Sequence, residues 1–183
     1  MRKDYIVLIV GESGSGKSEI CNYLKSTYGI KELKSYTTRP CRGVGDNSHT
    51  FVSDEEFDEL VDMCAYTEYN GYRYCATDKQ VEESDIYIID PKGVEYFYKH
   101  YNGSKIPMVA YISAHEDVRR ARMCMRGNSR LEADERIDLD NGVFENATDM
   151  ATYIYYNNDD SMNDVIRIGE LIYNTFFNDG KEE

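Results

Sequence analysis

A short apolar run followed at once by a glycine-rich turn constrains the fold of this chain more than any other feature. Residues 5–10 read Tyr-Ile-Val-Leu-Ile-Val, which is typical of a central strand in a parallel sheet, buried on both faces. Residues 11–18 then match the pattern G-x-x-x-x-G-K-[ST], and a helix is predicted from about Lys17 to Tyr28. The backbone N–H groups of such a loop surround phosphate oxygens. The pattern therefore predicts a loop for the phosphates of a nucleoside triphosphate, formed by Gly11, Ser13, Gly14, Ser15, Gly16, Lys17 and Ser18.

Two side chains of this loop carry predicted chemistry. Lys17 is expected to contact the β- and γ-phosphates, and the Ser18 hydroxyl is expected to ligate a Mg²⁺ ion that arrives with the nucleotide. ATPases, GTPases and kinases all carry such a loop, so the loop alone does not name the reaction. The rest of the chain has to discriminate between them.

Charge and cysteine content exclude several classes of function. The 183 residues include 34 acidic and 21 basic side chains, which give a formal net charge of −13. Such a chain is not expected to bind nucleic acid or an anionic membrane through a basic surface. The five cysteines contain no C-x-x-C pair, and no segment approaches the ~20 apolar residues needed to span a bilayer. The expectation is a cytoplasmic protein with reduced thiols.

The later part of the chain alternates between strand and helix patterns. Apolar runs at 86–89, 108–112 and 153–156 predict strands. A capping box of Ser113 and Glu116 predicts a helix to about Arg126. This alternation predicts an α/β fold with a parallel central sheet and helices on both faces. Further helices are expected from Pro91, up to about Phe144, and at 162–177.

Residues 35–83 interrupt the alternation. A capping box of Ser53 and Glu56 predicts a helix to about Met63, and Asn70-Gly71 between two β-rich runs predicts a hairpin. We expect one domain over 1–183, with a core of 1–34 and 84–183 and a small mixed α+β subdomain inserted at 35–83.

Arginine clusters stand out against the acidic background. Residues 35–43 hold Arg39 and Arg42 beside three Ser and Thr hydroxyls, and the planar guanidinium binds phosphate through two parallel hydrogen bonds. Six further arginines lie between 119 and 136, and those at 119, 122 and 126 share one helical face. A solvated polar loop and a salt-bridged surface helix are the ordinary alternatives for these two segments.

Taken together, these segments resemble the guanylate kinase family, over nearly the whole chain and in the family's order. The most specific part is the Ser-x-Thr-Thr-Arg segment from Ser35 to Arg39, followed by Phe-Val-Ser at 51–53. The other matching segments are Glu55-Glu56-Phe57, Glu68-Tyr69, Tyr72 to Thr77, Arg126-Gly127 and Asn158-Asp159-Asp160.

The resemblance implies the three-layer fold of P-loop kinases, with the inserted subdomain binding a monophosphate and a helical lid at about 126–136. It implies ATP-dependent phosphorylation of a nucleoside monophosphate, with GMP or dGMP as the first choice. By resemblance, Arg122, Arg126 and Arg136 act beside Lys17 in catalysis, and Asn158 contacts ATP. The implied acceptor contacts are Ser35, Arg39, Arg42, His49, Glu68, Tyr74, Thr77 and Asp90.

The base preference depends on Glu68. Guanine presents adjacent N–H donors at N1 and N2, and an ionised carboxylate only accepts hydrogen bonds. An exposed strand residue is the ordinary alternative. The chain also departs from the family. Ile88 stands where an acid is usual, His49 replaces a tyrosine, and Cys75-Ala76 replaces a Gly-Ser/Thr pair, so that Thr77 would have to supply the missing hydroxyl.

Two rival readings stay open. The ribosyl-bisphosphate phosphokinases also carry a Thr-Arg-Pro loop and a downstream histidine, which Thr38-Arg39-Pro40 and His49 resemble; Glu68 speaks against this reading. A non-catalytic guanylate kinase-like binding module is the second rival. Such modules usually lose the phosphate loop, whereas residues 16–18 are intact here.

Overall fold

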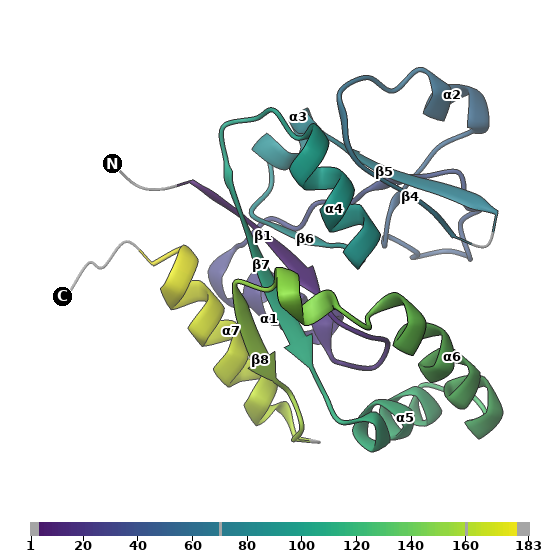
Figure 1. The fold of residues 1–183 in the computed structure, drawn as a ribbon, viewed down its shortest axis with the longest axis vertical. Coiled ribbons are helices and arrows are strands. Elements are labelled where there is room, and N and C mark those ends of the chain that lie inside the picture. Colours follow the sequence, from purple (N-terminus) through teal and green to yellow (C-terminus); the bar gives the residue numbers. More distant parts are fainter. Residues whose placement is uncertain (1–3, 70, 160, 179–183) are drawn as a thin grey trace.

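An all-parallel sheet runs through the centre of the molecule (Figure 1). The computed structural model describes residues 4–69, 71–159 and 161–178, and it orders the four strands of this sheet β6-β1-β7-β8. The apolar runs of the sequence form these strands, so the predicted parallel sheet is confirmed. Their bounds are Tyr5–Val10 for β1, Ile86–Ile88 for β6, Ile106–Ser113 for β7 and Tyr153–Tyr156 for β8.

Both faces of the central sheet are covered, which explains why its strands are continuously apolar. In β1, Ile6 and Leu8 pack into one hydrophobic core, while Val7 and Ile9 pack into another on the opposite face. All four side chains are fully buried. A strand with one wet face would instead alternate apolar and polar residues.

Two helices, α1 (Lys17–Tyr28) and α7 (Met162–Phe176), cover one face of the sheet. They approach each other closely at Gly169, where a Cβ atom would lie 2.4 Å from the ring of Tyr23. The N-terminus of α1 directly follows the glycine-rich loop, so this packing fixes the helix that begins at the candidate phosphate site.

The opposite face carries helix α4 (Pro91–His100) and a second sheet with the strand order β3-β2-β5-β4. This sheet is mixed, because β2 and β3 are parallel while the other pairs are antiparallel. It comes from the segment expected to interrupt the core, and the predicted hairpin joins β4 to β5, although Asn70 lies outside the described residues. The elements are β2 (Tyr36–Thr37), β3 (Thr50–Phe51), α2 (Asp54–Asp58), β4 (Met63–Tyr69), β5 (Tyr72–Thr77) and α3 (Asp78–Glu82).

Helices α5 (Glu116–Met125) and α6 (Arg130–Val143) form a pair beyond the carboxyl ends of the central strands (Figure 1). The turn between them contains Gly127, whose φ of +101° lies in the left-handed region. The segment expected as a lid therefore comprises the end of α5, this turn and the first half of α6. A 3₁₀ turn at Ala147–Met150 leads from α6 toward β8.

Two helix predictions were wrong. The helix that begins after Ser53 ends at Asp58, and Met63 already belongs to β4; the chain reverses at Asp62, whose φ is +53°. Ser113 does not cap α5, because it remains in the strand ladder opposite Tyr156 and His115 takes the N-cap position without a side-chain bond.

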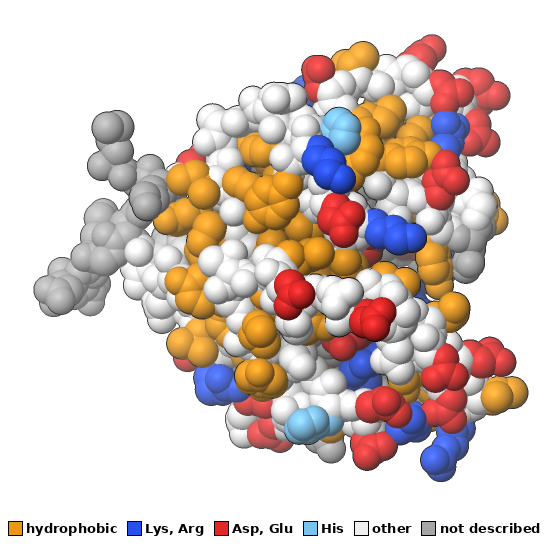
Figure 2. Space-filling model, viewed as in Figure 1, with side chains coloured by type: hydrophobic (Ala, Val, Ile, Leu, Met, Phe, Trp, Pro, Cys, Tyr) orange, Lys and Arg blue, Asp and Glu red, His pale blue; other side chains and the backbone are white. Residues whose placement is uncertain are grey.

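The surface agrees with the acidic composition. On the face shown in Figure 2, acidic side chains gather near α2 and near α5 and α6, while Lys and Arg are scattered. The side chains of Asp54 and Asp58 in α2 and of Asp117 in α5 are 67–97% exposed. None of the helices within the described residues combines the length and apolar character needed to cross a bilayer.

Candidate active site

The glycine-rich loop wraps tightly against its neighbours between β1 and α1. Gly16 has a φ of +95°, and a Cβ atom there would lie 2.2 Å from Nδ2 of Asn157. Gly14 has a φ of +78°, and a Cβ atom there would lie 2.7 Å from the backbone oxygen of Arg119. Only glycine adopts this backbone without strain and leaves room for these neighbours. No side chain caps the N-terminus of α1, so its first N–H groups are available to an anion.

Lys17 lies at the centre of the loop, and its side chain is half-buried. Its Nζ donates to the backbone oxygens of Gly11, at 2.6 Å, and Glu12, at 2.9 Å. Burial lowers the pKa of Lys17 to about 8, although the carboxylates of Asp140 and Glu12 oppose this shift. The ammonium group thus donates its hydrogen bonds to the loop itself in this structure. A bound phosphate oxygen would compete with the two backbone oxygens for it.

The predicted arginines converge on the loop from α5 and α6. Arg122 donates to Gly14 O at 3.3 Å and to Asn157 O at 3.1 Å, and Arg136 Nε donates to Ser13 Oγ at 3.0 Å. Arg126 pairs with Glu19 of α1 at 2.5 Å. The structure thus brings together the three arginines that the sequence singled out, although their catalytic role stays a prediction.

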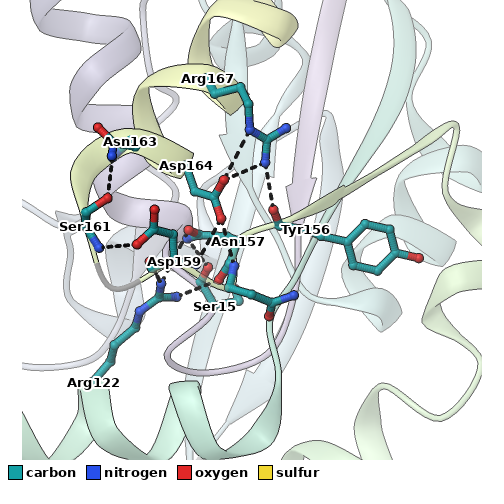
Figure 3. Close-up of polar contacts among 10 residues, drawn as sticks. Ser15, Arg122, Tyr156, Asn157, Asp159, Ser161, Asn163, Asp164 and Arg167 are labelled. Atoms are coloured by element: carbon teal, nitrogen blue, oxygen red, sulfur yellow. Dashed lines mark hydrogen bonds and ion pairs between the residues drawn. The ribbon is translucent and has the colours of Figure 1, made fainter.

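Of the two adjacent asparagines, Asn157 contacts the loop and Asn158 does not. The fully buried Asn157 donates through Nδ2 to Ser15 O at 2.7 Å (Figure 3). Asn158 instead accepts from the backbone N–H of His115 at 2.7 Å, where α5 begins. The prediction chose the neighbouring residue of the Asn-Asn-Asp-Asp run at 157–160, and Asp160 of that run lies outside the described residues.

A cavity of about 200 Å³ opens beside the start of α1. Gly16 and Asn157 form one wall, and the exposed side chains of Met125 and Met162 form part of the rim. Arg122 and Arg126 complete the lining, so the cavity continues directly from the phosphate loop.

A second cavity, of about 260 Å³, lies on the other side of Lys17, between the phosphate loop and the second sheet. We call it the acceptor cavity. It brings four residues of the predicted acceptor set next to Lys17, although these residues come from separate segments of the chain. They are Ser35, His49, Tyr74 and Asp90.

Ser35 and His49 form a hydrogen-bonded pair in the wall of the acceptor cavity. Ser35 Oγ lies 2.9 Å from Nδ1 of His49, and the ring of Tyr74 packs edge-on against the imidazole at 5.3 Å. Burial, reinforced by the nearby charge of Arg39, lowers the pKa of His49. A neutral imidazole at neutral pH can donate only one ring proton. Tyr87, which sequence reasoning missed, also lines this wall.

The two predicted acceptor arginines do not line the acceptor cavity. Arg39 is 7% exposed and pairs with Asp46 at 3.1 Å, and its guanidinium lies over the ring of Phe51 at 5.1 Å. Arg42 is exposed, and its backbone N–H donates to the same carboxylate at 3.1 Å. Residues 39–48 thus satisfy Arg39 within their own loop.

Glu68 and Thr77 also lie outside the acceptor cavity. Glu68 is exposed on β4, accepts a hydrogen bond from Tyr66 Oη and faces an adjoining cavity of about 300 Å³. Thr77 caps α3, because its Oγ accepts from Gln80 N at 3.4 Å. The hydroxyl of Thr77 is therefore engaged in capping α3. The part of β4 that lines the acceptor cavity comprises Ala65, Tyr66, Thr67 and Tyr69.

Ser18, the predicted metal ligand, and Asp90 are two oxygen-bearing side chains at the candidate site. Asp90 caps α4 by accepting from Gly93 N at 2.8 Å, and it also lines the acceptor cavity. Ser18 is exposed at the start of α1. No group of three or more acidic, His or Cys side chains suited to a metal occurs in the described segments. Such a sparse donor set fits a Mg²⁺ ion held mainly by phosphate oxygens and water.

Sequence reasoning missed two charged residues that contact the loop. Arg119 is 3% exposed and donates through Nε to Ser13 O at 3.0 Å. Asp140 accepts from Ser13 N at 2.6 Å. The sequence did offer one signal for Arg119, because it shares a helical face with Arg122. Nothing local in the sequence marks Asp140.

The chain matches no protein-family model and no curated protein. Among solved structures, the crystal structure of guanylate kinase from Anaplasma phagocytophilum aligns with a TM-score of 0.60 and 21% identity, covering 96% of this chain and 87% of that one. An uncharacterized protein from Eubacterium ventriosum aligns with a TM-score of 0.53 and 14% identity, covering 95% and 98%. At this identity the likeness shows the fold alone. The expected α/β fold with a parallel central sheet is therefore confirmed.

Proposed function

We propose that this chain transfers the γ-phosphoryl group of ATP to a nucleoside monophosphate. The observation that carries the proposal is the position of Lys17. Its ammonium group lies in the phosphate loop and also lines the acceptor cavity. A donor phosphate in the loop and an acceptor phosphate in the cavity would therefore meet at this one charge.

On the donor side, the loop would hold the triphosphate and the cavity beside α1 would hold the base. Arg122 and Arg136 already contact the loop through Gly14 and Ser13. They would neutralise the charge that spreads over the transferring phosphoryl group. Mg²⁺, bound with the nucleotide beside Ser18, would supply further charge neutralisation.

On the acceptor side, Ser35, His49 and Tyr74 would hold the monophosphate. Its second pKa is about 6, so it is largely ionised at neutral pH and needs no general base. Catalysis then requires alignment of two polyanions and exclusion of water. We propose that the inserted subdomain 35–83 closes over them and that the lid 126–136 is a second moving part. On this closure Arg39 and Arg42 would have to turn from Asp46 to the acceptor phosphate.

We retain GMP or dGMP as the first acceptor to test, with Glu68 as the base reader. Glu68 shares its strand with Thr67 and Tyr69, which line the acceptor cavity, and with Asp90 and Arg136 it lines the adjoining one. A modest closing movement would bring the two cavities together. One oxygen of Glu68 is engaged by Tyr66, which leaves the other to accept from guanine.

A second candidate is a ribosyl-bisphosphate acceptor, and one observation favours it. The part of β4 that lines the cavity offers Ala65, which is 2% exposed, and Thr67, without a carboxylate. Such a wall does not require a base with adjacent N–H donors. His49 lines the same cavity and fits a phosphate at either end of such a sugar.

One assay separates these candidates. ADP production from ATP is measured against GMP, dGMP, AMP, CMP and ribose 1,5-bisphosphate, with ATP alone as the control for hydrolysis. A rate with GMP at least 100-fold above that with AMP supports the guanine reading. Ribose 1,5-bisphosphate as the sole working acceptor would replace it. Absence of ADP with every acceptor, combined with no calorimetric binding of MgATP, would identify a binding module instead.

A further inference from the structure

The phosphate loop already carries an anion in this structure, and that anion belongs to the chain itself. Ser13 N, one of the backbone N–H groups of the loop, donates to Oδ2 of Asp140 at 2.6 Å. The same oxygen accepts from Nη2 of Arg119 at 3.2 Å. Asp140 comes from α6, 127 residues away in the sequence, so tertiary packing brings its carboxylate to the loop.

The groups around Asp140 are those that bind phosphate. Besides the loop N–H and the guanidinium, the ammonium of Lys17 is close enough that Asp140 opposes the lowering of its pKa. A carboxylate surrounded by donors and cations has the environment that a phosphate oxygen would require. A ligand for a metal ion would instead be expected among other oxygen acceptors, and Arg119 and Lys17 would repel a cation there.

A second contact from the same helix strengthens this arrangement. Arg136 lies one turn before Asp140 on α6, and its Nε donates to Ser13 Oγ at 3.0 Å. Both residues therefore hold α6 against Ser13. The apolar cluster between α5 and α6 is small, since its buried members are Met123, Ala133 and Ile137. These two polar contacts are thus a substantial part of what keeps α6 against the loop.

We propose that Asp140 is a built-in competitor of the nucleotide, so that ATP occupies the phosphate loop only when α6 withdraws this carboxylate. The inference deepens the proposed function and rests on it, because it concerns the same loop. Withdrawal of Asp140 releases Ser13 N and Arg119 to a phosphate, and it frees Arg136 from the Ser13 hydroxyl. The apparent affinity for ATP is reduced by the fraction of molecules in which α6 is closed.

Calorimetric titration with MgATP tests the proposal on four full-length proteins: the wild type, D140N, D140A and D138N. Asp138 is an exposed residue two positions away on α6, on the other side of the helix, so D138N changes the net charge by the same amount. The dissociation constant of D140N and D140A is expected to fall at least tenfold, because a charge-assisted contact no longer competes. That of D138N should stay within twofold of the wild type.

The variants are expected to fold, because Arg119 keeps a second carboxylate, Glu12, at 3.5 Å. Far-UV circular dichroism and a thermal unfolding curve check this. Hydrogen exchange provides a second readout that does not depend on affinity. In D140A without nucleotide, the amides of α6 should exchange at least as fast as those of the wild type saturated with MgATP. Slower exchange than in the nucleotide-free wild type would contradict the proposal.

The possible outcomes are distinct. An unchanged affinity in D140N and D140A overturns the inference and leaves the proposed function intact. A weaker affinity together with a raised Mg²⁺ requirement also overturns it and makes Asp140 a group on the metal side. If no protein binds MgATP, the inference and the proposed function fall together. Tighter binding in the Asp140 variants supports the inference even if no acceptor is phosphorylated.

Discussion

The phosphate loop and the loop of residues 39–48 differ in how each satisfies its charged groups. The phosphate loop is partly buried, and its backbone is anchored by Arg122 of α5, by Asp140 of α6 and by Asn157, which directly follows β8. In residues 39–48, which are largely exposed, Arg39 pairs with Asp46 of the same loop. The backbone of the donor half is therefore held by distant elements and has its contact with Asp140 to give up to a ligand, whereas Arg39 in the acceptor half has to exchange the contacts that it makes within its own loop.

The largest expected effect on activity comes from a substitution in the phosphate loop. Lys17→Ala should lower kcat at least 100-fold, on the order of 3 kcal/mol, because it removes the charge shared by the two phosphates. Lys25→Ala, which removes an equal charge from the same helix where Lys25 pairs with Glu32, is the control. Steady-state ADP release measures both variants. Full activity of Lys17→Ala would contradict the kinase mechanism.

A smaller effect on the kinetics is expected from a substitution in residues 39–48. Arg39→Ala should raise the KM of the monophosphate about 30-fold, on the order of 2 kcal/mol, because a charged hydrogen-bond donor to its phosphate is lost. The KM of ATP should change less than about twofold. Arg167→Ala, which removes a charge beside Asp164 on α7, serves as the control. Equal changes for the two substrates would remove Arg39 from the acceptor site.

The next effect in size concerns the preference of the acceptor half for one base over another. Glu68→Gln replaces a pure acceptor with a mixed donor and acceptor, so the ratio of kcat/KM for GMP over AMP should fall about tenfold, on the order of 1.4 kcal/mol. Glu55→Gln makes the same change on the exposed surface of α2. Competition assays with both monophosphates measure the ratio. A ratio that Glu68→Gln does not alter would assign base recognition to the wall formed by Ala65, Thr67 and Tyr69.

The smallest effect concerns pH. Hydrogen bonds from the Ser48 hydroxyl and the Arg42 N–H, with Arg39 nearby, hold the pKa of Asp46 well below its usual range. A depressed pKa means that Asp46 stabilises the folded loop above the unfolded value of about 3.9, and that this stabilisation is lost as the pH falls through the folded value. Intrinsic-rate-corrected hydrogen exchange of residues 39–48 should stay constant from pH 8 to 5. A rise within that window would contradict the assignment.

The elements that the sequence predicted correctly are those whose signals are local. The strand–loop–helix unit around residues 5–28 combines an apolar run, a glycine pattern and a helix end at Gly29, and each is readable over a few residues. The capping box at Ser53 also holds. The one at Ser113 fails because pairing with β8, which is distant in the sequence, keeps that residue in the strand. A local motif cannot report such a competing partner.

The residues of the candidate site also divide into those with a local signal in the sequence and those whose contacts are distant in it. Lys17, Ser35, His49 and Asp90, which the sequence analysis singled out, line one cavity, and their roles stay predictions. Asn157 and Asp140 were missed because their contacts with Ser15 and Ser13 span 142 and 127 residues. Nothing in the sequence reveals that Arg39 is engaged by Asp46, since that depends on the path of residues 39–48.

The contact between Gly16 and Asn157 has a consequence for how the protein is synthesised. The loop lies near the N-terminus, but its backbone is completed by a side chain that directly follows β8, the last strand of the central sheet. During translation the N-terminal strand, loop and helix emerge first, and Asn157 emerges after most of the other elements. A nascent chain that lacks β8 therefore lacks part of the phosphate site. Any protection that nucleotide binding gives against unfolding or proteolysis becomes available only after Asn157 has emerged.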